Sequence, residues 1–407
     1  MRSLYFSYFF NLIALFFALF IVFQDIFISF LPRYFDYWDE IFTIICFFIY
    51  CCSYIKKVNK NNFVVLLFFL LSILICAFGN IVYGYQTSID ACFRDILAIL
   101  KFPIVFLCFS RLDFSNVLVK EIYRIVPVIK FIVIVAFGLG IVSLFLDIGL
   151  SQDELRFGIH PYFFIFSHPT YLTTCFAFLL CLYNSSSTAS KSAELMLVFC
   201  ILLAMRSKGI VFVCLYYFVK FFYSYLKSHI VIFSLTLLFL IIVVSYDKIQ
   251  LYNSFSNSPR ESLYKGSIYL LFYCFPFGAG LGAFASHLSA KFDSNVYNFI
   301  MIPDMYDQEG NLTAVVGDAG LPYYVGQFGL FGLIVIILAY SKIFQSSVVN
   351  LTFSKNSSVF LLWGLILITM PTEAILINNG VVIAIYLIIL RKFEILKNSR
   401  DFVNGLK

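Results

Sequence analysis

Long apolar segments recur along this chain, and short polar segments separate them. A helix needs about 20 mainly apolar residues to cross the hydrocarbon core of a bilayer. Twelve segments reach or approach that length, the seventh and the last being short: 4–23, 41–55, 63–83, 89–109, 128–146, 163–183, 195–205, 210–226, 230–246, 321–340, 359–377 and 380–390. Charged residues make up only 12% of the chain, against roughly 25% in soluble domains. The sequence therefore predicts an all-α polytopic integral membrane protein with about 12 transmembrane helices.

The distribution of lysine and arginine predicts the orientation of these spans. If the N-terminus is cytoplasmic, most of the 28 basic residues fall in cytoplasmic segments, as the positive-inside rule requires. Both termini are then cytoplasmic, which agrees with an even number of spans. We assign the formal net charge of +6 mainly to lipid contacts at the inner face. No basic and aromatic surface suited to nucleic acid stands out.

Three parts of the chain follow from this topology. Residues 1–246 hold the first nine predicted spans and an outer loop at 147–162. Residues 247–320 form a large outer loop, and residues 321–407 hold the last three spans and a cytoplasmic tail. The large loop is rich in carboxylates, which include Asp293, Asp304, Asp307, Glu309 and Asp318.

The large outer loop contains a sequence signature for the start of a helix. Residues 258–261 form an S-x-x-E capping box with proline at the first helical position, so we expect a short helix from Pro259. Its apolar residues recur on one face at helical spacing, and polar residues occupy another. This pattern predicts an interfacial helix that ends before Pro276. The apolar face holds Leu263, Leu270, Leu271 and Cys274, and the polar face holds Arg260, Tyr264 and Ser267.

Arg260 falls in the first turn of that helix, beside backbone N–H groups that have no partner within the helix. Those groups and the guanidinium together would bind a phosphate. The alternative is that Arg260 pairs with a nearby carboxylate or a lipid headgroup. The glycine run at 276–282 lacks the third glycine of a dinucleotide fingerprint, and we expect a tight, backbone-exposed turn there instead of a nucleotide site.

Other basic residues are predicted on the same outer side. Arg156 lies in the loop at 147–162, where two acidic neighbours make an ion pair the alternative to a substrate role. His168 follows a little further on. Arg206 and Lys208 lie between two spans that follow each other closely, where the charge rule disfavours them. Such a violation favours an anionic partner, which would offset its cost.

The sequence predicts neither a metal site nor a cofactor. Most of the 11 cysteines fall inside predicted spans, and no pair has C-x-x-C spacing. The four histidines show no H-E-x-x-H pattern.

Arginines on the outer face, together with carboxylates and an interfacial helix, predict a site for an amphiphilic anion held at the membrane surface. A polyprenyl-diphosphate sugar is such a molecule. Its diphosphate is a good leaving group, so the protein need only neutralise the charge that develops on it and deprotonate an acceptor hydroxyl. Arginine matches phosphate oxygens bidentately, and a carboxylate suits the base.

At this point the chain resembles the O-antigen polymerase and O-antigen ligase superfamily. The resemblance lies in the twelve predicted spans, the two arginine-bearing outer loops and the ending from Asp318 to Gly332. The ligase branch has a histidine and a small polar residue eleven positions before a G-x-x-G. Here Gly329 and Gly332 fit the G-x-x-G, but Asp318 and Ala319 stand at the other two positions. The missing histidine favours the polymerase branch, Wzy-type.

The resemblance implies a metal-independent, inverting glycosyltransferase at the periplasmic face of the bacterial inner membrane. It would transfer a growing glycan from undecaprenyl diphosphate to the non-reducing end of an incoming lipid-linked repeat unit, alongside a chain-length regulator. Arg156 and Arg260 correspond to the two loop arginines of the family, and Asp318 is the candidate general base. Substrate-binding roles are expected for Arg206, Lys208, His168, Glu261, Tyr264 and Glu309, of which Glu309, Glu261 and His168 are also rivals for the base.

Two other functions stay open. An O-antigen ligase acting on lipid A-core belongs to the same superfamily. A flippase for lipid-linked oligosaccharides belongs to another class, because twelve spans are equally typical of transporters. Transporters tend to have small outer loops and charges near the middle of the membrane. Here the largest loop and the expected site are on the outer side, which favours the enzyme.

Overall fold

The computed structural model describes residues 13, 16–17, 19–31, 35, 37–54, 60–111, 114–156, 158–185, 190–226, 235, 259–300, 319–349, 351 and 357–398. Within these ranges the chain is helical, and the only β-type pairings are two isolated bridges in the loop before α7. The all-α prediction is confirmed for the described residues. The first predicted span up to residue 12 and the ninth, at 230–246 except residue 235, lie outside them, as do Glu309 and Asp318.

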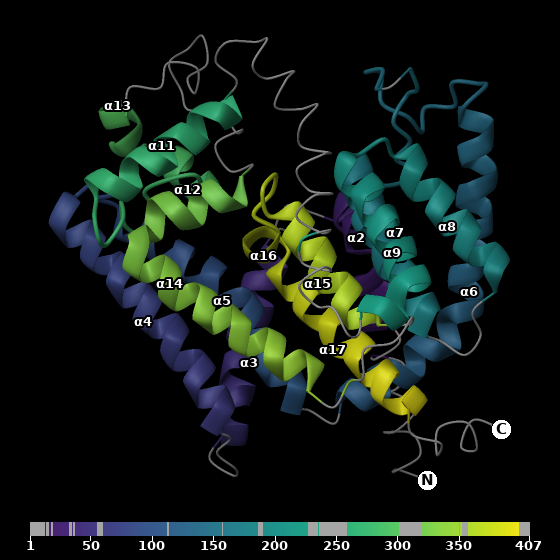
Figure 1. The fold of residues 1–407 in the computed structure, drawn as a ribbon, viewed down its shortest axis with the longest axis horizontal. Helices are drawn as coiled ribbons and strands as arrows, with labels where there is room; N and C mark the ends of the chain where they lie inside the picture. The colour runs from purple at the N-terminus through teal and green to yellow at the C-terminus, as the bar shows by residue number, and fades with distance from the viewer. Residues whose placement is uncertain are drawn as a thin grey trace.

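Fifteen described helices carry the labels of Figure 1. They are α2 (Gln24–Phe30), α3 (Trp38–Tyr54), α4 (Lys60–Tyr83), α5 (Ile89–Arg111), α6 (Phe114–Ser143), α7 (Pro169–Ser185), α8 (Lys191–Leu203), α9 (Ser207–Leu226), α11 (Pro259–Tyr273), α12 (His287–Lys291), α13 (Val296–Ile300), α14 (Gly320–Val348), α15 (Ser358–Thr369), α16 (Ile375–Asn378) and α17 (Gly380–Asn398). Among them, α4, α6 and α14 contain stretches long and apolar enough to cross a membrane. The chain is therefore a membrane protein by its described helices.

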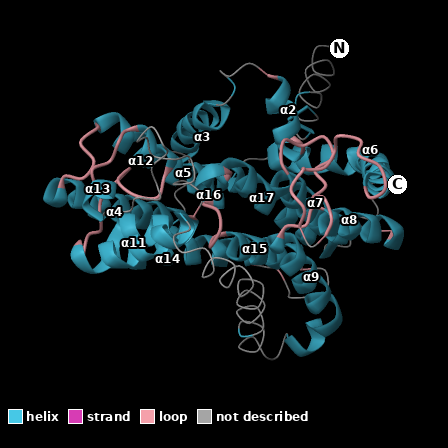
Figure 2. Ribbon diagram, turned by 90° about the horizontal axis from the view of Figure 1, so that it is seen from above, coloured by secondary structure: helices cyan, strands magenta, loops and turns pink. Residues whose placement is uncertain are grey.

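The helices form two groups, and a central pair of helices lies between them (Figures 1 and 2). On one side, α14 packs along α4 and α11, and α3 packs on α5. On the other side, α8 packs against α6, α7 and α9. Between them, α17 contacts α5, α6 and α7, while α15 contacts α7 and α9. Residues 380–390 of α17 are buried throughout, so this short apolar segment forms the centre of the bundle.

The predicted spans 163–183 and 359–377 each contain a non-helical segment. The segment 163–183 becomes helical only at Pro169, since residues 163–168 form a loop in which Phe164 has a φ of 55°. Proline at the first helical position has no N–H to leave unpaired. The segment 359–377 divides into α15 and α16, and the turn between them carries Glu373. Both non-helical segments place polar backbone groups beside residues of the candidate site, His168 and Glu373.

The helix predicted from Pro259 is confirmed: α11 begins there and ends at Tyr273, three residues before Pro276. Leu263, Leu270 and Cys274 are fully buried, and Leu271 is half-buried. The helix packs on α14. Its opposite face exposes apolar side chains, as a helix at a lipid boundary does; these are Ile268, Tyr269, Phe272 and Tyr273.

The glycine run at 276–282 is a tight turn, as predicted, but the prediction that its backbone is exposed was wrong. Gly278 has a φ of 83° and lies against a kink of α14 at Gly329. A Cβ on Gly278 would come within 2.3 Å of the Gly329 nitrogen. Asn80 holds the turn from α4, since its Nδ2 donates to the Leu281 carbonyl at 3.0 Å. The G-x-x-G ending therefore has a packing role here, because only glycine permits this approach.

Charged side chains inside the bundle are paired. Lys101 of α5 is 6% exposed and donates to Asp39 at 2.6 Å and to Glu40 at 2.7 Å, which joins α5 to α3. Asp95 is fully buried and accepts hydrogen bonds from the Gly282 N–H, the Tyr323 hydroxyl and the Gln327 amide. Pairing offsets the desolvation of these charges.

Candidate functional site

The loop before α7 is fixed by hydrogen bonds at its base. The Tyr162 N–H donates to the Leu203 carbonyl at 3.0 Å, and the Tyr162 hydroxyl donates to the Ala136 carbonyl at 2.8 Å. Tyr162 is 1% exposed. The Arg156 N–H donates to the Ile159 carbonyl at 2.9 Å and closes the tip. These contacts hold Arg156 beside the turn between α8 and α9.

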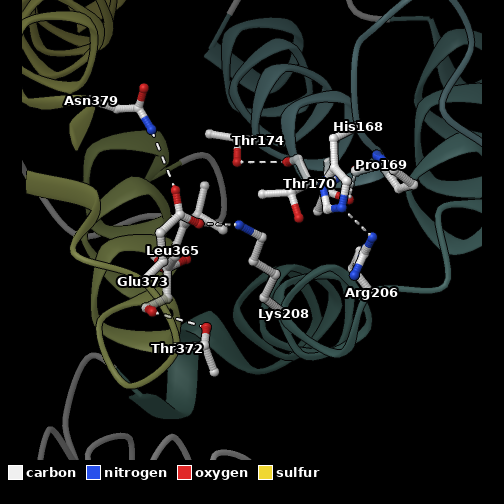
Figure 3. A network of polar contacts seen from close by, with 12 residues as sticks. His168, Pro169, Thr170, Thr174, Arg206, Lys208, Leu365, Thr372, Glu373 and Asn379 are labelled. Atoms are coloured by element: carbon white, nitrogen blue, oxygen red, sulfur yellow. Dashed lines mark hydrogen bonds and ion pairs between the residues drawn. The ribbon is translucent and has the colours of Figure 1, made fainter. Parts of the chain in front are cut away.

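Arg206 lies in that turn and is the centre of the site. Its Nη2 donates to Gln152 Oε1 at 2.9 Å. The same Nη2 donates to His168 Nε2 at 2.7 Å (Figure 3). Its Nε is buried and has no hydrogen-bond partner among the described residues. Both bonded partners are uncharged acceptors, and no carboxylate in the described part of the chain bonds Arg206. The guanidinium is thus held in place without a counterion from the described residues.

Two further arginines act on Arg206. Burial and, to a smaller extent, the positive charges of Arg156 and Arg260 lower the pKa of Arg206 to about 10, while Glu154 opposes them. The three arginines come from the loop before α7, the turn before α9 and the first turn of α11. The fold therefore brings together three cations that lie 50 and 54 residues apart in the sequence. At neutral pH Arg206 stays protonated, since a pKa near 10 lies well above 7.

His168 is uncharged at neutral pH. Burial lowers its pKa to about 4, and the charges of Arg206, Lys208 and Arg156 act in the same direction, while Glu373 opposes them. Because the Arg206 guanidinium can only donate, His168 Nε2 is the acceptor in their contact. His168 therefore orients Arg206 without neutralising it.

Lys208 connects this cluster to the turn between α15 and α16. Its Nζ donates to Glu373 Oε2 at 2.7 Å, and Asn379 Nδ2 donates to Glu373 Oε1 at 3.4 Å (Figure 3). In the same turn, the Pro371 carbonyl accepts a hydrogen bond of 2.7 Å from the Tyr264 hydroxyl of α11. Burial raises the pKa of Tyr264 to about 12, an effect that Arg260 opposes. The turn thus ties the polar face of α11 to α9.

A pocket of about 550 Å³ opens between the loop before α7 and Arg206. Its lining residues are Ser151, Gln152, Asp153, Glu154, Arg156, Phe163, His168 and Arg206. Arg156 Nη2 lies 3.5 Å from Glu154 Oε2. The ion pair that was the alternative to a substrate role for Arg156 is therefore present. Glu154 is 78% exposed in its side chain, and an exposed pair of this kind contributes at most about 1 kcal/mol. The pair therefore leaves Arg156 available to an anion in the pocket.

The structure brings together most of the residues predicted for the site. Arg156, Arg206, Lys208 and His168 form one cluster, and Arg260 and Tyr264 border it. Glu261 instead pairs with Lys265, one turn further along α11, at 2.5 Å. Among the described residues, no group of three or more His, Cys, Asp or Glu side chains could hold a metal ion. All 11 cysteines are free.

Two site residues carried no strong sequence signal. Gln152 is a polar residue in a polar loop, and nothing in its position distinguished it. Glu373 follows proline and threonine inside a long apolar segment, where a carboxylate is costly. That cost was the one signal that could have assigned Glu373 to the site.

A scan against protein-family models, a search of curated proteins and a search of solved structures each returned no match.

Proposed function

We propose that this protein is an O-antigen polymerase of the Wzy type, a glycosyltransferase that uses a polyprenyl-diphosphate donor at the periplasmic face of the bacterial inner membrane. The proposal includes about twelve spans with both termini in the cytoplasm, the number that the apolar segments indicate. The single observation that carries it is Arg206, a half-buried guanidinium without a carboxylate partner among the described residues and close to two further arginines.

Such a cluster is destabilising unless an anion occupies it. Like charges repel each other, and partial burial strengthens the repulsion because less water screens it. A diphosphate carries several negative charges and many acceptor oxygens, and arginine binds such oxygens bidentately. The lipid tail of the donor would lie in the bilayer beside the exposed apolar face of α11. An amphiphilic diphosphate therefore fits both the charge and the position of the cluster.

In the proposed reaction a hydroxyl oxygen of the acceptor sugar attacks the anomeric carbon of the donor glycan. A new C–O bond forms there, and the bond between that carbon and the diphosphate oxygen breaks. The arginines stabilise the charge that appears on the leaving diphosphate. A carboxylate accepts the proton of the attacking hydroxyl. Undecaprenyl diphosphate leaves without its glycan.

The proposed base is Asp318, which lies outside the described residues. It directly precedes Ala319 and Gly320, and Gly320 packs against the backbone of Glu373. Glu373 is a described carboxylate that borders the cluster, through its contact with Lys208. We therefore weigh Glu373 beside Asp318 as the group that accepts the proton.

A flippase is the second candidate function. It is favoured by Lys101 and Asp95, which are buried, and by Asp39 and Glu40, which pair with Lys101, because charges inside a bundle are typical of transport pathways. An O-antigen ligase stays less favoured because Asp318 stands where the ligase branch has histidine.

The glycan made by a strain that lacks this protein tests the proposal. Cells without a polymerase carry single repeat units, while cells without a ligase or flippase carry none. Repeat units trapped on the inner leaflet would identify a flippase. Complementation with Arg206→Gln should leave single repeat units, and long chains from that variant would contradict the proposed role of Arg206.

A further inference from the structure

A second and larger cavity, of about 820 Å³, lies on the other side of the α7 N-terminus. Its walls come from α2, α3, α5, α7, α12, α16 and α17 and from the turn before α16. Along α5 the lining runs from Asp90 to Lys101, which at 1.5 Å per residue is about 16 Å of helix. The cavity is therefore as deep as about half the hydrocarbon core of a bilayer.

The wall between the two cavities is thin. Phe166 and Tyr171 line the large cavity, while His168, between them in sequence, lines the arginine pocket. Glu373 also lines the large cavity, and its Oε2 accepts from Lys208, which borders the arginine cluster. Figure 3 shows Lys208 reaching Glu373 and Arg206 reaching His168 at the α7 N-terminus. A ligand in each cavity would be separated by only these side chains.

The large cavity has the opposite electrostatic character to the arginine cluster. Six carboxylates and three basic side chains line it among the described residues. Of the basic groups, Lys101 is shared between Asp39 and Glu40, and Arg94 pairs with Asp90 at 3.1 Å. Asp25 bonds only to the backbone N–H and hydroxyl of Ser167 among the described residues. The lining therefore holds an excess of negative charge.

The cavity also offers acceptors that the described residues leave unused. Gln24 Oε1 and Glu40 Oε2 are buried, line the cavity and have no hydrogen-bond partner in the described part of the chain. Buried acceptors without a donor are costly, so they indicate a donor that binds there. Three exposed aromatic rings share the lining, namely Tyr37, Phe93 and Tyr171. Carboxylates accept hydrogen bonds from sugar hydroxyls, and aromatic faces cover the apolar faces of sugar rings.

We propose that this cavity binds the sugar of the incoming acceptor unit, and that it takes neutral or amino sugars and excludes acidic ones. The inference rests on the proposed function, since a polymerase needs an acceptor site beside its donor site. Excess carboxylates repel an acidic sugar and attract an ammonium group. The two cavities therefore bind different groups. The arginine pocket binds the diphosphate, and the carboxylate-lined cavity binds an uncharged or cationic sugar.

Trp38 provides a direct readout, because it lines the cavity and the chain has only one other tryptophan, Trp363. The Trp363→Phe variant of the full chain, in nanodiscs of uncharged lipid, reports on Trp38 alone. The probes are three trisaccharides of equal length, built from glucose, glucosamine and galacturonic acid. We expect the neutral and amino trisaccharides to change the Trp38 emission saturably. The acidic trisaccharide should bind with an affinity at least tenfold weaker. An acidic trisaccharide that binds as well as the neutral one, or no response to any, overturns the inference.

Matched variants test where the sugar binds and whether the charge of the lining selects it. Ala98→Phe on α5 fills part of the cavity and should weaken the neutral trisaccharide at least tenfold, while Leu70→Phe on the exposed face of α4 should leave it unchanged. Asp90→Asn removes a lining charge and should improve binding of the acidic trisaccharide several-fold. Asp147→Asn, in an exposed loop outside the lining, should not. Equal effects within either pair would contradict the proposed site.

Binding of farnesyl diphosphate separates this inference from the proposed function. If binding of the lipid diphosphate depends on Arg206 but the sugars do not bind, the inference of an acceptor cavity is contradicted and the proposed donor site is supported. If the sugars bind but the lipid diphosphate does not, the proposed function falls instead.

Discussion

Arg206 Nη2 donates a 2.7 Å hydrogen bond to His168 Nε2, so a permanently charged side chain is oriented by a ring that carries no charge. A carboxylate in the place of His168 would neutralise Arg206 and compete with an incoming anion. A neutral acceptor fixes the direction of the guanidinium and leaves its charge for a ligand. Preorganisation of this kind lowers the cost of binding, since the side chain is already ordered.

The first prediction concerns Arg206 itself. Arg206→Gln should weaken farnesyl diphosphate binding by about 2 kcal/mol, or roughly 30-fold in Kd, because a hydrogen bond to a charged group is lost. Titration of the protein in nanodiscs measures this. The control is Arg124→Gln on α6, whose guanidinium pairs with Glu121 at 2.7 Å and does not line the pocket. Equal losses in the two variants would point to a general effect of charge.

Arg156 tests whether bidentate geometry matters. Arg156→Lys keeps the charge but loses the planar pair of donors. We expect single repeat units in cells and at least a tenfold loss of transfer in membranes. Full chain length in this variant would reduce Arg156 to a point charge that steers the donor.

The base can be assigned by comparing two carboxylates. Removal of a general base typically lowers kcat by about 10²- to 10⁴-fold. Asp318→Asn should do so while donor binding stays intact, and Glu373→Gln should then have a smaller effect on kcat. The opposite ranking would move the proton-accepting role to Glu373. Single-turnover transfer with a preloaded donor measures the chemical step separately from binding.

His168 predicts a pH dependence of stability. Its pKa is about 4 in the folded chain and 6.5 ordinarily, so below pH 6.5 the unfolded chain takes up a proton that the folded chain refuses. The free energy of unfolding should therefore fall as the pH drops from 6.5 toward 4 and be insensitive to this group above 6.5. His168→Gln, which keeps an acceptor for Arg206, should lose less stability than the wild type between pH 7 and 5. Thermal unfolding at the two pH values compares them, and identical shifts would exclude His168 as the source.

The buried glycine turn predicts a strong effect on folding. Gly278→Ala adds a Cβ that would meet Gly329 backbone at 2.3 Å and places alanine at a φ of 83°. Gly84→Ala shares the positive φ, at 65°, but its Cβ would meet nothing within 4 Å. Gly84→Ala should cost about 1 kcal/mol from backbone strain alone, and Gly278→Ala clearly more. Equal Tm values for the two variants would show that the contact between the turn and α14 is not tight.

The sequence by itself determined the features that depend on neighbours along the chain. The apolar segments, the helix that begins at Pro259 and the tight turn at 276–282 all follow from local patterns of apolar residues, proline and glycine. The arginines next to predicted spans were also identifiable, because charge beside a membrane span is costly and needs a reason.

Only the tertiary structure decided which of these residues meet. Arg156, Arg206 and Arg260 come from segments far apart in the chain, and the packing of α15 and α17 between the two helix groups brings their elements together. The position of α15 and α16 gave Glu373 its place beside Lys208, and the packing of α14 on α4 buried the turn at Gly278. Local patterns set which face of a helix is apolar, but contacts between distant segments depend on how those faces fit against each other, which no single segment encodes.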